Sequence, residues 1–300
     1  MPEPQPEISL IICTYNREKF LGHALQSLTQ QTLPAEDFEI LIINNNATDS
    51  TPQISQDFIA KNPKLNVRYF VESNQGLSYA RNRGIKEALA PIITYIDDDA
   101  EAENDFLEQI LTFFKDKPEA AGVGGRIIPK YEGDPPQWMN KYLYGFVTKV
   151  DFGDRVFTYT GKSYPAGCNM SYRKDLLEQV GGFNENLKWR ADDKYIFFAI
   201  KEISDKVFHY PKAMVRHNID AYRTTDENFF QLSRKFGSEE RIRVRDRGQV
   251  PYLKKVFEFI FKLGASIVLA ILFAVKGEWI KGKYTMLYRY YALAGLLSAK

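Results

Sequence analysis

The sequence predicts an α/β fold, in which helices cover both faces of a central, mostly parallel sheet and a C-terminal helical region follows. Over the first 130 residues, short continuous apolar runs alternate with longer amphipathic stretches. This alternation is typical of a parallel sheet covered on both faces, because strands buried on both sides carry apolar residues throughout. Beyond residue 225 the chain becomes basic and aromatic, in stretches of helical length.

Four apolar runs of strand length lie in the first hundred residues, at 8–13, 38–44, 67–71 and 91–96. The stretches between them have helical patterns, and Pro52 suits the first turn of the second helix. The predicted helices cover about 17–31, a segment that begins near 49, about 77–89 and about 103–115.

The pattern between residues 130 and 225 is less regular. Two consecutive prolines, scattered aromatic residues and several glycines indicate short strands and loops. We expect a strand near 164–172, a helix near 173–180, a helix from about 192 and a short strand at 206–210.

The charge of the chain is unevenly distributed. Its net charge of +2 does not suggest a nucleic-acid-binding protein. Residues 1–227 carry 26 basic and 33 acidic residues, a net of −7, whereas residues 228–300 carry 14 and 5, a net of +9. We therefore expect two parts with different partners. With only two cysteines and no signal-peptide pattern at the amino terminus, the sequence predicts a cytoplasmic protein.

Polar residues follow each of the four predicted strands, in the segments Thr14–Arg17, Asn44–Asp49, Glu72–Gly76 and Asp97–Asp99. A single polar strand end is usually a helix cap or a turn. Because ligands of parallel sheets bind beyond the carboxyl ends of the strands, four such ends together predict a ligand site.

The triplet Asp97, Asp98 and Asp99 is the most distinctive of these ends. Adjacent carboxylates repel one another unless a cation neutralises them, and oxygen ligands suit Mg²⁺ or Mn²⁺ together with substrate phosphates. In an extended segment Asp97 and Asp99 share one side, so one of these two would hold the metal. The alternative is a solvated acidic turn that caps the following helix.

Three further features fit such a site, and each also has an ordinary structural explanation. Arg81 suits the charge of a diphosphate, or lies on a solvated helix face. Asp192 and Asp193 begin a helix, where carboxylates stay ionised as a general base requires, although helix capping explains them equally well. His217 would suit a Mg²⁺ or Mn²⁺ site, but a lone histidine is more often an ordinary surface or core residue.

These segments together resemble glycosyltransferase family 2, whose members have the GT-A fold with a Rossmann-like sheet. The resemblance runs from about Ile8 to His217, and Asp192–Asp193 stands where the family commonly has Glu-Asp. It is carried by ISLIICTYNREKFL, LIINNNATDST, NQGLSYARNRGI, YIDDDA and PAGCNMSYRKDLLEQVGGFNENL. It implies a GT-A domain over 1–225, with a nucleotide-binding half at 1–100 and an acceptor-side half at 101–225.

For the donor, the resemblance implies a nucleotide-sugar pocket at the carboxyl edge of the sheet. Its residues would be Thr14, Asn16 and Asn45 at the base and ribose, Arg81 at the nucleotide or its phosphates, Asp97 at the nucleotide sugar, and Arg126 near the donor sugar. Asp98 would be a further donor-binding residue. Many members have aspartate where this chain has Asn45. This difference leaves the identity of the nucleotide base open, because an amide both accepts and donates hydrogen bonds.

For catalysis, the resemblance implies an inverting transfer of one sugar from a nucleotide diphosphate to an acceptor hydroxyl. Asp99 would hold Mn²⁺ or Mg²⁺, and His217 stands where many members place a further metal ligand. Asp193 would be the catalytic base, with Asp192 beside it. Two other functions stay open, a non-catalytic nucleotide-sugar-binding scaffold at a membrane and a nucleotidyltransferase. A nucleotidyltransferase usually has a Gly-rich loop near its amino terminus, and the corresponding segment TYNREKFLGHA is not Gly-rich.

The basic tail, residues 226–300, predicts a membrane-associating or assembly region. The uncharged run 263–275 would be about 20 Å long as a helix, short of the roughly 30 Å hydrocarbon core of a bilayer. Its basic and aromatic flanks suit helices in a membrane interface or a re-entrant pair. We expect residues 250–300 to hold the protein at the inner face of the cell membrane, near a sugar or lipid-linked acceptor of polysaccharide or glycolipid synthesis. The alternative is a buried hairpin or a homo-oligomer contact.

Overall fold

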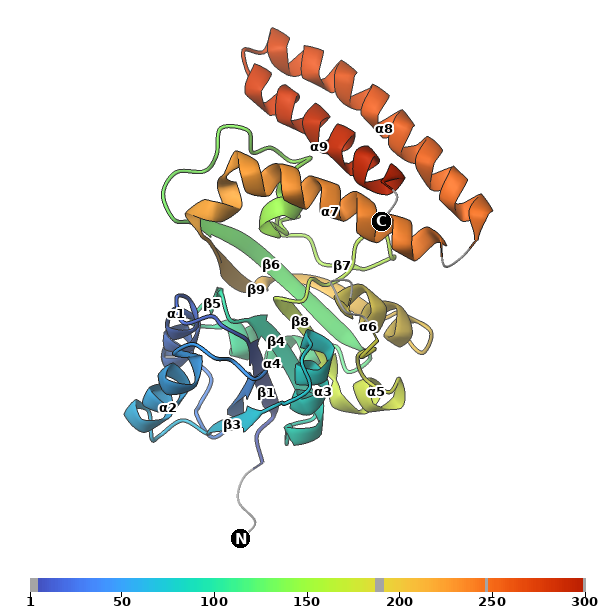
Figure 1. The fold of residues 1–300 in the computed structure, drawn as a ribbon. Helices are drawn as coiled ribbons and strands as arrows, with labels where there is room; N and C mark the ends of the chain where they lie inside the picture. The colour runs from blue at the N-terminus through green and yellow to red at the C-terminus, as the bar shows by residue number, and fades with distance from the viewer. Residues whose placement is uncertain (1–4, 187–191, 246–247, 299–300) are drawn as a thin grey trace. The chain divides into compact units, whose positions relative to one another are not determined.

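A computed structural model describes residues 5–186, 192–245 and 248–298 (Figure 1). The chain folds into two compact units, the first made of residues 1–129 and 150–218 and the second of residues 130–149 and 219–300. The sequence places its boundary near 225 instead, with residues 130–149 in the first part. The structure groups them with the C-terminal helices, because their aromatic side chains pack against those helices.

Across the described residues, nine strands form one sheet in the order β3-β2-β1-β4-β8-β6-β9-β5, with β7 paired to β9. The strands are β1 Ile8–Thr14, β2 Phe38–Asn44, β3 Val67–Val71, β4 Ile92–Asp97, β5 Ala100–Ala102, β6 Gly122–Tyr131, β7 Phe157–Thr158, β8 Asn169–Arg173 and β9 Val207–Ile219. The four strands of the first hundred residues pair in parallel. Beyond β4, the pairs β4–β8, β8–β6, β9–β5 and β9–β7 are antiparallel. The predicted α/β fold is confirmed.

Helices cover both faces of this sheet, as the apolar strands require. They are α1 Leu21–Ser27, α2 Thr51–Lys61, α3 Leu77–Glu87, α4 Phe106–Asp116, α5 Lys174–Gln179 and α6 Asp192–Lys201. Alternate residues of β1 point to opposite faces. Leu10 joins a core with Leu25 of α1 and Phe106 of α4, whereas Ile11 joins a second core with Ala80 of α3 and Ile196 of α6.

Several predicted elements differ in length from the observed ones, among them the strand expected near 164–172, which is observed as β8 Asn169–Arg173. The helix expected over 17–31 begins only at Leu21, because the preceding residues form a turn in which Asn16 has a φ of 51°. The Asn16 carboxamide accepts a hydrogen bond from the Thr48 N–H over 2.8 Å, which holds this turn. The strand expected at 206–210 continues to Ile219, because β9 pairs with β7 near its start and with β5 near its end.

The second unit contains three helices, α7 Asp226–Arg245, α8 Gln249–Val275 and α9 Trp279–Leu297, and an aromatic core that α7 and α9 share with residues 138–146. Trp138 and Phe146 contact Phe229 of α7 and Tyr284 of α9, and the Trp138 and Tyr284 rings are stacked with their centroids 5.6 Å apart. Burial of large aromatic surfaces is strongly stabilising. This burial explains why residues 130–149 belong with the C-terminal helices.

The helix α9 packs between α7 and α8 in this unit (Figure 1). By length and composition α8 is sufficient to cross a membrane. The expectation of an incomplete span is therefore wrong for the helix itself. Its apolar run continues back through a segment in which Glu258 forms ion pairs with Lys255 and Lys262 of the same helix, and these charges do not interrupt the helix.

Candidate active site

The carboxyl ends of β1, β2 and β4 lie side by side. Thr14 of β1 is paired with Asn44 of β2, and Cys13 is paired with Asp97 of β4. The polar segments that the sequence places after these strands therefore share one edge of the sheet. Thr14 and Asn45 are both buried there.

The acid cluster, Asp97–Asp99, is contacted by a histidine and two arginines. Nε2 of His217 lies 3.1 Å from Oδ1 of Asp99, because the β5–β9 pairing sets His217 opposite Ala100. The Arg17 guanidinium reaches Oδ1 of Asp98 at 3.4 Å and Oδ2 of Asp99 at 3.5 Å. Sequence reasoning did not select Arg17, although its position directly after β1 is the signal that would have found it.

Burial changes the acidity of this cluster. The side chains of Asp98 and Asp99 are less than a tenth exposed. Burial raises the pKa of Asp98 to about 7, against the opposing charge of Arg17 and with a further rise from Asp99. A carboxyl group in such surroundings is stabilised by a cation, since a cation removes the cost of keeping buried carboxylates ionised.

Arg81 joins two carboxylates that are far apart in the sequence. Its buried guanidinium forms an ion pair with Asp192 at the start of α6 and lies 3.5 Å from Oδ1 of Asp97 at the end of β4. Burial alone would lower the pKa of Arg81, but the two carboxylates outweigh burial and raise it. The guanidinium therefore stays charged and connects the acid cluster to the start of α6.

Asp193 follows in the first turn of α6 and faces a backbone loop. Its Oδ2 accepts a hydrogen bond from the Gly167 N–H over 3.2 Å, and its Oδ1 accepts one from the Lys194 N–H over 2.6 Å. Burial, and next the charge of Asp192, raise the pKa of Asp193. A carboxylate with a raised pKa is a stronger proton acceptor than an ordinary one while it remains ionised.

Gly167 is a site residue that the sequence did not single out. Its carbonyl accepts a hydrogen bond from Arg81 over 3.3 Å. A Cβ atom at this position would lie 2.5 Å from the Arg81 guanidinium, so only glycine leaves room for the guanidinium. Its place within the segment PAGCN, which the resemblance already includes, is the signal that would have found it.

Asn45 holds the loop after β3 in place, as Asn16 holds the turn after β1. The Asn45 amide donates to the carbonyls of Glu72 and Asn74 over 3.0 and 2.7 Å, and its oxygen accepts from the Gly76 N–H over 2.8 Å. An aspartate would make the last of these hydrogen bonds but not the first two. The asparagine therefore has a structural reason to stand here, and its contact with a base stays a prediction.

Arg126 on β6 pairs with a different set of carboxylates. Among the ion pairs of the described residues, its guanidinium lies 2.7 Å from Asp154 and 3.4 Å from Asp151. Arg81 thus contacts Asp97 and Asp192, and Asp193 follows Asp192 in the chain. Asp99, which contacts His217, follows directly after Asp97 and Asp98. Arg126 pairs instead with carboxylates of the segment 151–154.

Asp99 and His217 are the residues that suit a divalent metal ion. No group of three His, Cys, Asp or Glu side chains is placed to hold a metal among the described residues. A carboxylate and an imidazole in contact are nevertheless a fitting pair of ligands. Mg²⁺ and Mn²⁺ commonly take one or two protein ligands and complete their coordination with substrate phosphates and water, so the residues present fit such an ion.

Known proteins match both the sequence and the fold. The family model described as "Glycosyl transferase family 2" matches residues 9–181. A glucosyl-dolichyl phosphate glucuronosyltransferase of Haloferax volcanii is 26% identical over 73% of this chain and 71% of its own length. The dolichyl N-acetyl-alpha-D-glucosaminyl phosphate 3-beta-D-2,3-diacetamido-2,3-dideoxy-beta-D-glucuronosyltransferase of Methanococcus voltae is 32% identical over 88% of this chain and 82% of its own.

Two solved structures have a similar fold. The mannosyltransferase PcManGT of Pyrobaculum calidifontis, in complex with GDP-Man and Mn²⁺, superposes with a TM-score of 0.66 at 17% identity, covering 99% of this chain and 89% of its own. The S. aureus TarS 1-349 structure with UDP-GlcNAc superposes with a TM-score of 0.59 at 17% identity, covering 97% and 89%. Since the family model matches more than half of the chain, the protein belongs to glycosyl transferase family 2.

Proposed function

We propose that this enzyme transfers one sugar from a nucleotide-diphosphate donor to an acceptor hydroxyl, with inversion at the anomeric carbon. The observation that carries the proposal is the contact of Arg81 with both Asp97 and Asp192. Asp97 belongs to the strand end where the donor would bind, and Asp192 precedes the proposed base. One buried guanidinium thereby keeps the donor side and the acceptor side of the site together.

Asp193 is the proposed base. Its carboxylate would take the proton of the acceptor hydroxyl as that oxygen attacks the anomeric carbon. Two backbone N–H groups orient it, and its raised pKa favours proton transfer. Asp192 would act through its pairing with Arg81, which fixes the first turn of α6.

Asp99 and His217 are the proposed ligands of Mn²⁺ or Mg²⁺. Such an ion, when bound, would stabilise the charge that develops on the leaving diphosphate. The 3.1 Å contact between the two side chains and their burial support this assignment. PcManGT and GalNAc-T7 are relatives in fold whose structures contain Mn²⁺.

The donor would occupy the carboxyl edge of the sheet in the first unit. We assign Thr14, Asn16 and Asn45 to the base and ribose, and Asp97 to the nucleotide sugar, with Asp98 as a further donor-binding residue. The remaining donor contacts would come from Arg81 at the nucleotide or its phosphates and Arg126 near the donor sugar. Support comes from the strand register, which brings the ends of β1, β2 and β4 together.

The proposed acceptor is a lipid-linked sugar or an envelope polymer. The names of the Haloferax volcanii and Methanococcus voltae relatives are those of glucuronosyltransferases and include a dolichyl phosphate-linked sugar. A Staphylococcus aureus relative is by name a poly(ribitol-phosphate) beta-N-acetylglucosaminyltransferase. We propose that the second unit keeps the enzyme at the membrane where such an acceptor is found. The cytoplasmic location stays a prediction of the sequence.

The test is a panel of sugar nucleotides, with and without Mn²⁺ or Mg²⁺, in which thermal unfolding reports donor binding and product analysis reports transfer. A bound donor raises the unfolding temperature by mass action. Asp193→Asn should lose turnover and keep the donor-induced shift, whereas Asp99→Asn should lose the metal-dependent part of that shift. Asp205→Asn, at an exposed carboxylate of the same unit, is the matched control.

Three outcomes would contradict the proposal. Donor binding without transfer to any acceptor would indicate a non-catalytic binder. Release of pyrophosphate from a nucleoside triphosphate would indicate a nucleotidyltransferase. Full turnover of Asp193→Asn would exclude Asp193 as the base.

A further inference from the structure

The outward side of α8 is apolar along its whole length. The helix has 27 residues and is therefore about 40 Å long. Its most exposed apolar side chains are Phe261 and Val275, at 77% and 82%. The exposed apolar residues recur every three or four positions, which puts them on one side of the helix: Val250, Leu253, Phe257, Ile260, Phe261, Ile267, Val268, Ile271, Leu272 and Val275.

The opposite side of α8 is covered by protein. Gly282 of α9 approaches α8 so closely that a Cβ atom there would lie 2.7 Å from Cα of Ala270. Near the other end, the Tyr252 hydroxyl donates to the Leu296 carbonyl of α9 over 3.4 Å. Lys255 lies 3.1 Å from Glu240 of α7. The helix thus presents one face to the rest of its unit and the other to the surroundings.

A charge on the neighbouring helix argues against a bilayer-crossing α8. In Figure 1, α9 runs beside α8 in the same unit. If α8 crossed a bilayer, α9 would enter the hydrocarbon with it and would carry Arg289, near the middle of α9, there. Such a charge is costly at the bilayer centre. A helix that lies in the plane of the membrane avoids this cost, because only its outward side enters the lipid.

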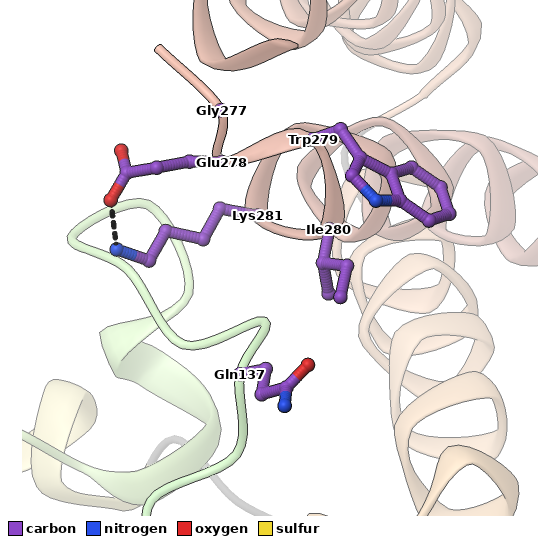
Figure 2. A pocket seen from close by; sticks show the side chains of 6 residues that line it. All are labelled: Gln137, Gly277, Glu278, Trp279, Ile280 and Lys281. Atoms are coloured by element: carbon purple, nitrogen blue, oxygen red, sulfur yellow. Dashed lines mark hydrogen bonds and ion pairs between the residues drawn. The ribbon is translucent and has the colours of Figure 1, made fainter.

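The two ends of the apolar face carry exposed cations and an indole. Lys254 lies near the start of the helix and Lys276 directly after its end, and both are exposed. At the turn into α9, the ammonium group of Lys283 lies 5.4 Å from the ring centroid of Trp279, which is 57% exposed. Figure 2 shows this turn, with the Trp279 indole directed away from the Glu278–Lys281 ion pair. Tryptophan and lysine are typical of the headgroup level of a membrane.

The same charges decide between a lipid surface and a second copy of the chain. In a two-fold contact through this face, the cations at its ends would meet cations of the other copy. Glu258, the acidic residue of α8, is already paired with Lys255 and Lys262. Anionic headgroups complement the exposed lysines, so the charge pattern favours lipid.

We propose that α8 lies in the plane of a phospholipid leaflet with anionic headgroups, and that its outward face is immersed in the acyl region. Lys254, Lys276 and Lys283 would contact the headgroups, with Trp279 at the same level. This inference rests on the proposed function only in that a membrane-held acceptor gives the contact a purpose. Binding to lipid can be measured without any sugar transfer.

Vesicle co-sedimentation of the full chain tests the contact. Vesicles of phosphatidylcholine with phosphatidylglycerol should bind the protein, and salt should weaken this binding because it screens the lysines. Phe261→Asp should weaken binding by about tenfold or more, since it puts a charge into the acyl region. Ile203→Asp introduces the same charge at an exposed apolar residue of the first unit and should leave binding unchanged.

Fluorescence quenching by brominated lipids tests the orientation. In a Trp279→Phe background, tryptophan is placed in turn at Phe257, Val268 and Val275, and the quenching of the Trp279→Phe protein itself, which retains Trp138 and Trp189, is subtracted. An in-plane helix gives all three the same shallow depth, so that lipids brominated near the headgroup quench all of them best. A gradient with Val268 deepest would show a crossing helix and overturn the proposal.

Two further results would also overturn it. Failure to bind these vesicles, together with a concentration-dependent dimer that Phe261→Asp dissociates, would assign the face to a second copy. Equal binding of the wild-type protein and Phe261→Asp would exclude immersion of this face. The donor-induced thermal shift of Phe261→Asp is measured in parallel, so that loss of lipid binding with an intact shift is distinguished from failure of the transferase site.

Discussion

At the scale of single residues, Arg81 affects both the stability of the first unit and the geometry of the proposed site. It is buried and forms ion pairs with Asp97 and Asp192. A buried charge that loses its partner is far more costly than a buried pair. The stability of the first unit and the geometry of the proposed site therefore depend on the same guanidinium.

Arg81→Met should destabilise the protein by roughly 3–5 kcal/mol, because it leaves Asp192 buried without its cation. Arg81→Met combined with Asp192→Leu should recover part of this loss, since the buried carboxylate is removed as well. Urea unfolding of the two variants measures both effects. If the double variant is no more stable than Arg81→Met alone, the Asp192 pairing is not the source of the stability.

His209 predicts how stability changes in weak acid. Burial lowers its pKa to about 4, below the ordinary histidine value of about 6.5. The contribution of the neutral imidazole is therefore complete above about pH 6.5 and is lost as the pH falls through about 4, up to roughly 3 kcal/mol. The free energy of unfolding of His209→Gln should change less with pH over this range than that of the wild type. His23→Gln, at an exposed histidine, is the control, and an equal pH dependence in all three would contradict the prediction.

The residues of the site were predictable to the extent that they follow strands. The acid triplet, Thr14 and Asn45 stand directly after apolar runs, and parallel strands bring such ends to one edge. Arg17 was missed because a long cation after a strand looks like an ordinary surface residue. That Arg81 pairs with Asp192 was beyond the sequence pattern, since α3 and α6 are brought together only by packing on the same face of the sheet.

At the scale of secondary-structure elements, the contact between α7 and α9 depends on two glycines. A Cβ atom at Gly237 of α7 would lie 1.8 Å from the Ala292 carbonyl oxygen, and one at Gly295 of α9 would lie 2.0 Å from that of Arg234. The two backbones are therefore in direct contact. Such close helix packing allows no side chain larger than hydrogen at these positions.

Gly237→Ala should destabilise the second unit by roughly 1–3 kcal/mol, because the helices must move apart to admit the methyl group. Gly264→Ala on α8 is the opposite case. A Cβ atom at Gly264 would have no neighbour within 4 Å, so the better helix propensity of alanine should stabilise the unit by about 0.5–1 kcal/mol. Thermal unfolding compares the two, and a higher unfolding temperature for Gly237→Ala would show that the helices are not in such close contact.

The elements with strong local patterns were predicted well. The strands at 38–44 and 67–71 have the predicted bounds, because a mainly apolar run of strand length flanked by polar residues has clear ends. The full length of β9 was not predicted, because Pro211 and the charged residues Lys212 and Arg216 interrupt the apolar run after residue 210. Its partners, β5, β6 and β7, come from distant parts of the chain.

At the scale of the whole molecule, the second unit is assembled from two separate stretches of chain. The stretch 130–149 leaves β6 and returns next to it, since Ile127 and Val150 exchange backbone hydrogen bonds of 2.8 and 3.1 Å. It supplies Trp138 and Phe146 to the core that α7 and α9 complete. A cut at the predicted boundary would divide this core.

A chain that stops at residue 225 should therefore be poorly soluble, because it retains Trp138 and Phe146 without the helices that cover them. A second truncation also removes residues 130–149, with a short linker from Pro129 to Val150, and ends at Asn218. This version should be more soluble, and binding of a hydrophobic dye compares the two. If the chain that stops at residue 225 is as soluble as the second truncation and binds as little dye, residues 130–149 do not need the helices to cover their aromatic side chains.

The interleaving of the two units also sets an order of events during synthesis. When Trp138 and Phe146 leave the ribosome, Phe229 and Tyr284, which they contact in the finished protein, have not yet been made. The segment 130–149 must then remain an exposed aromatic loop until the last helix has been synthesised. Proteins that bind unfolded aromatic segments would find their target in this loop, and translation pauses after residue 149 would lengthen the time during which it is available.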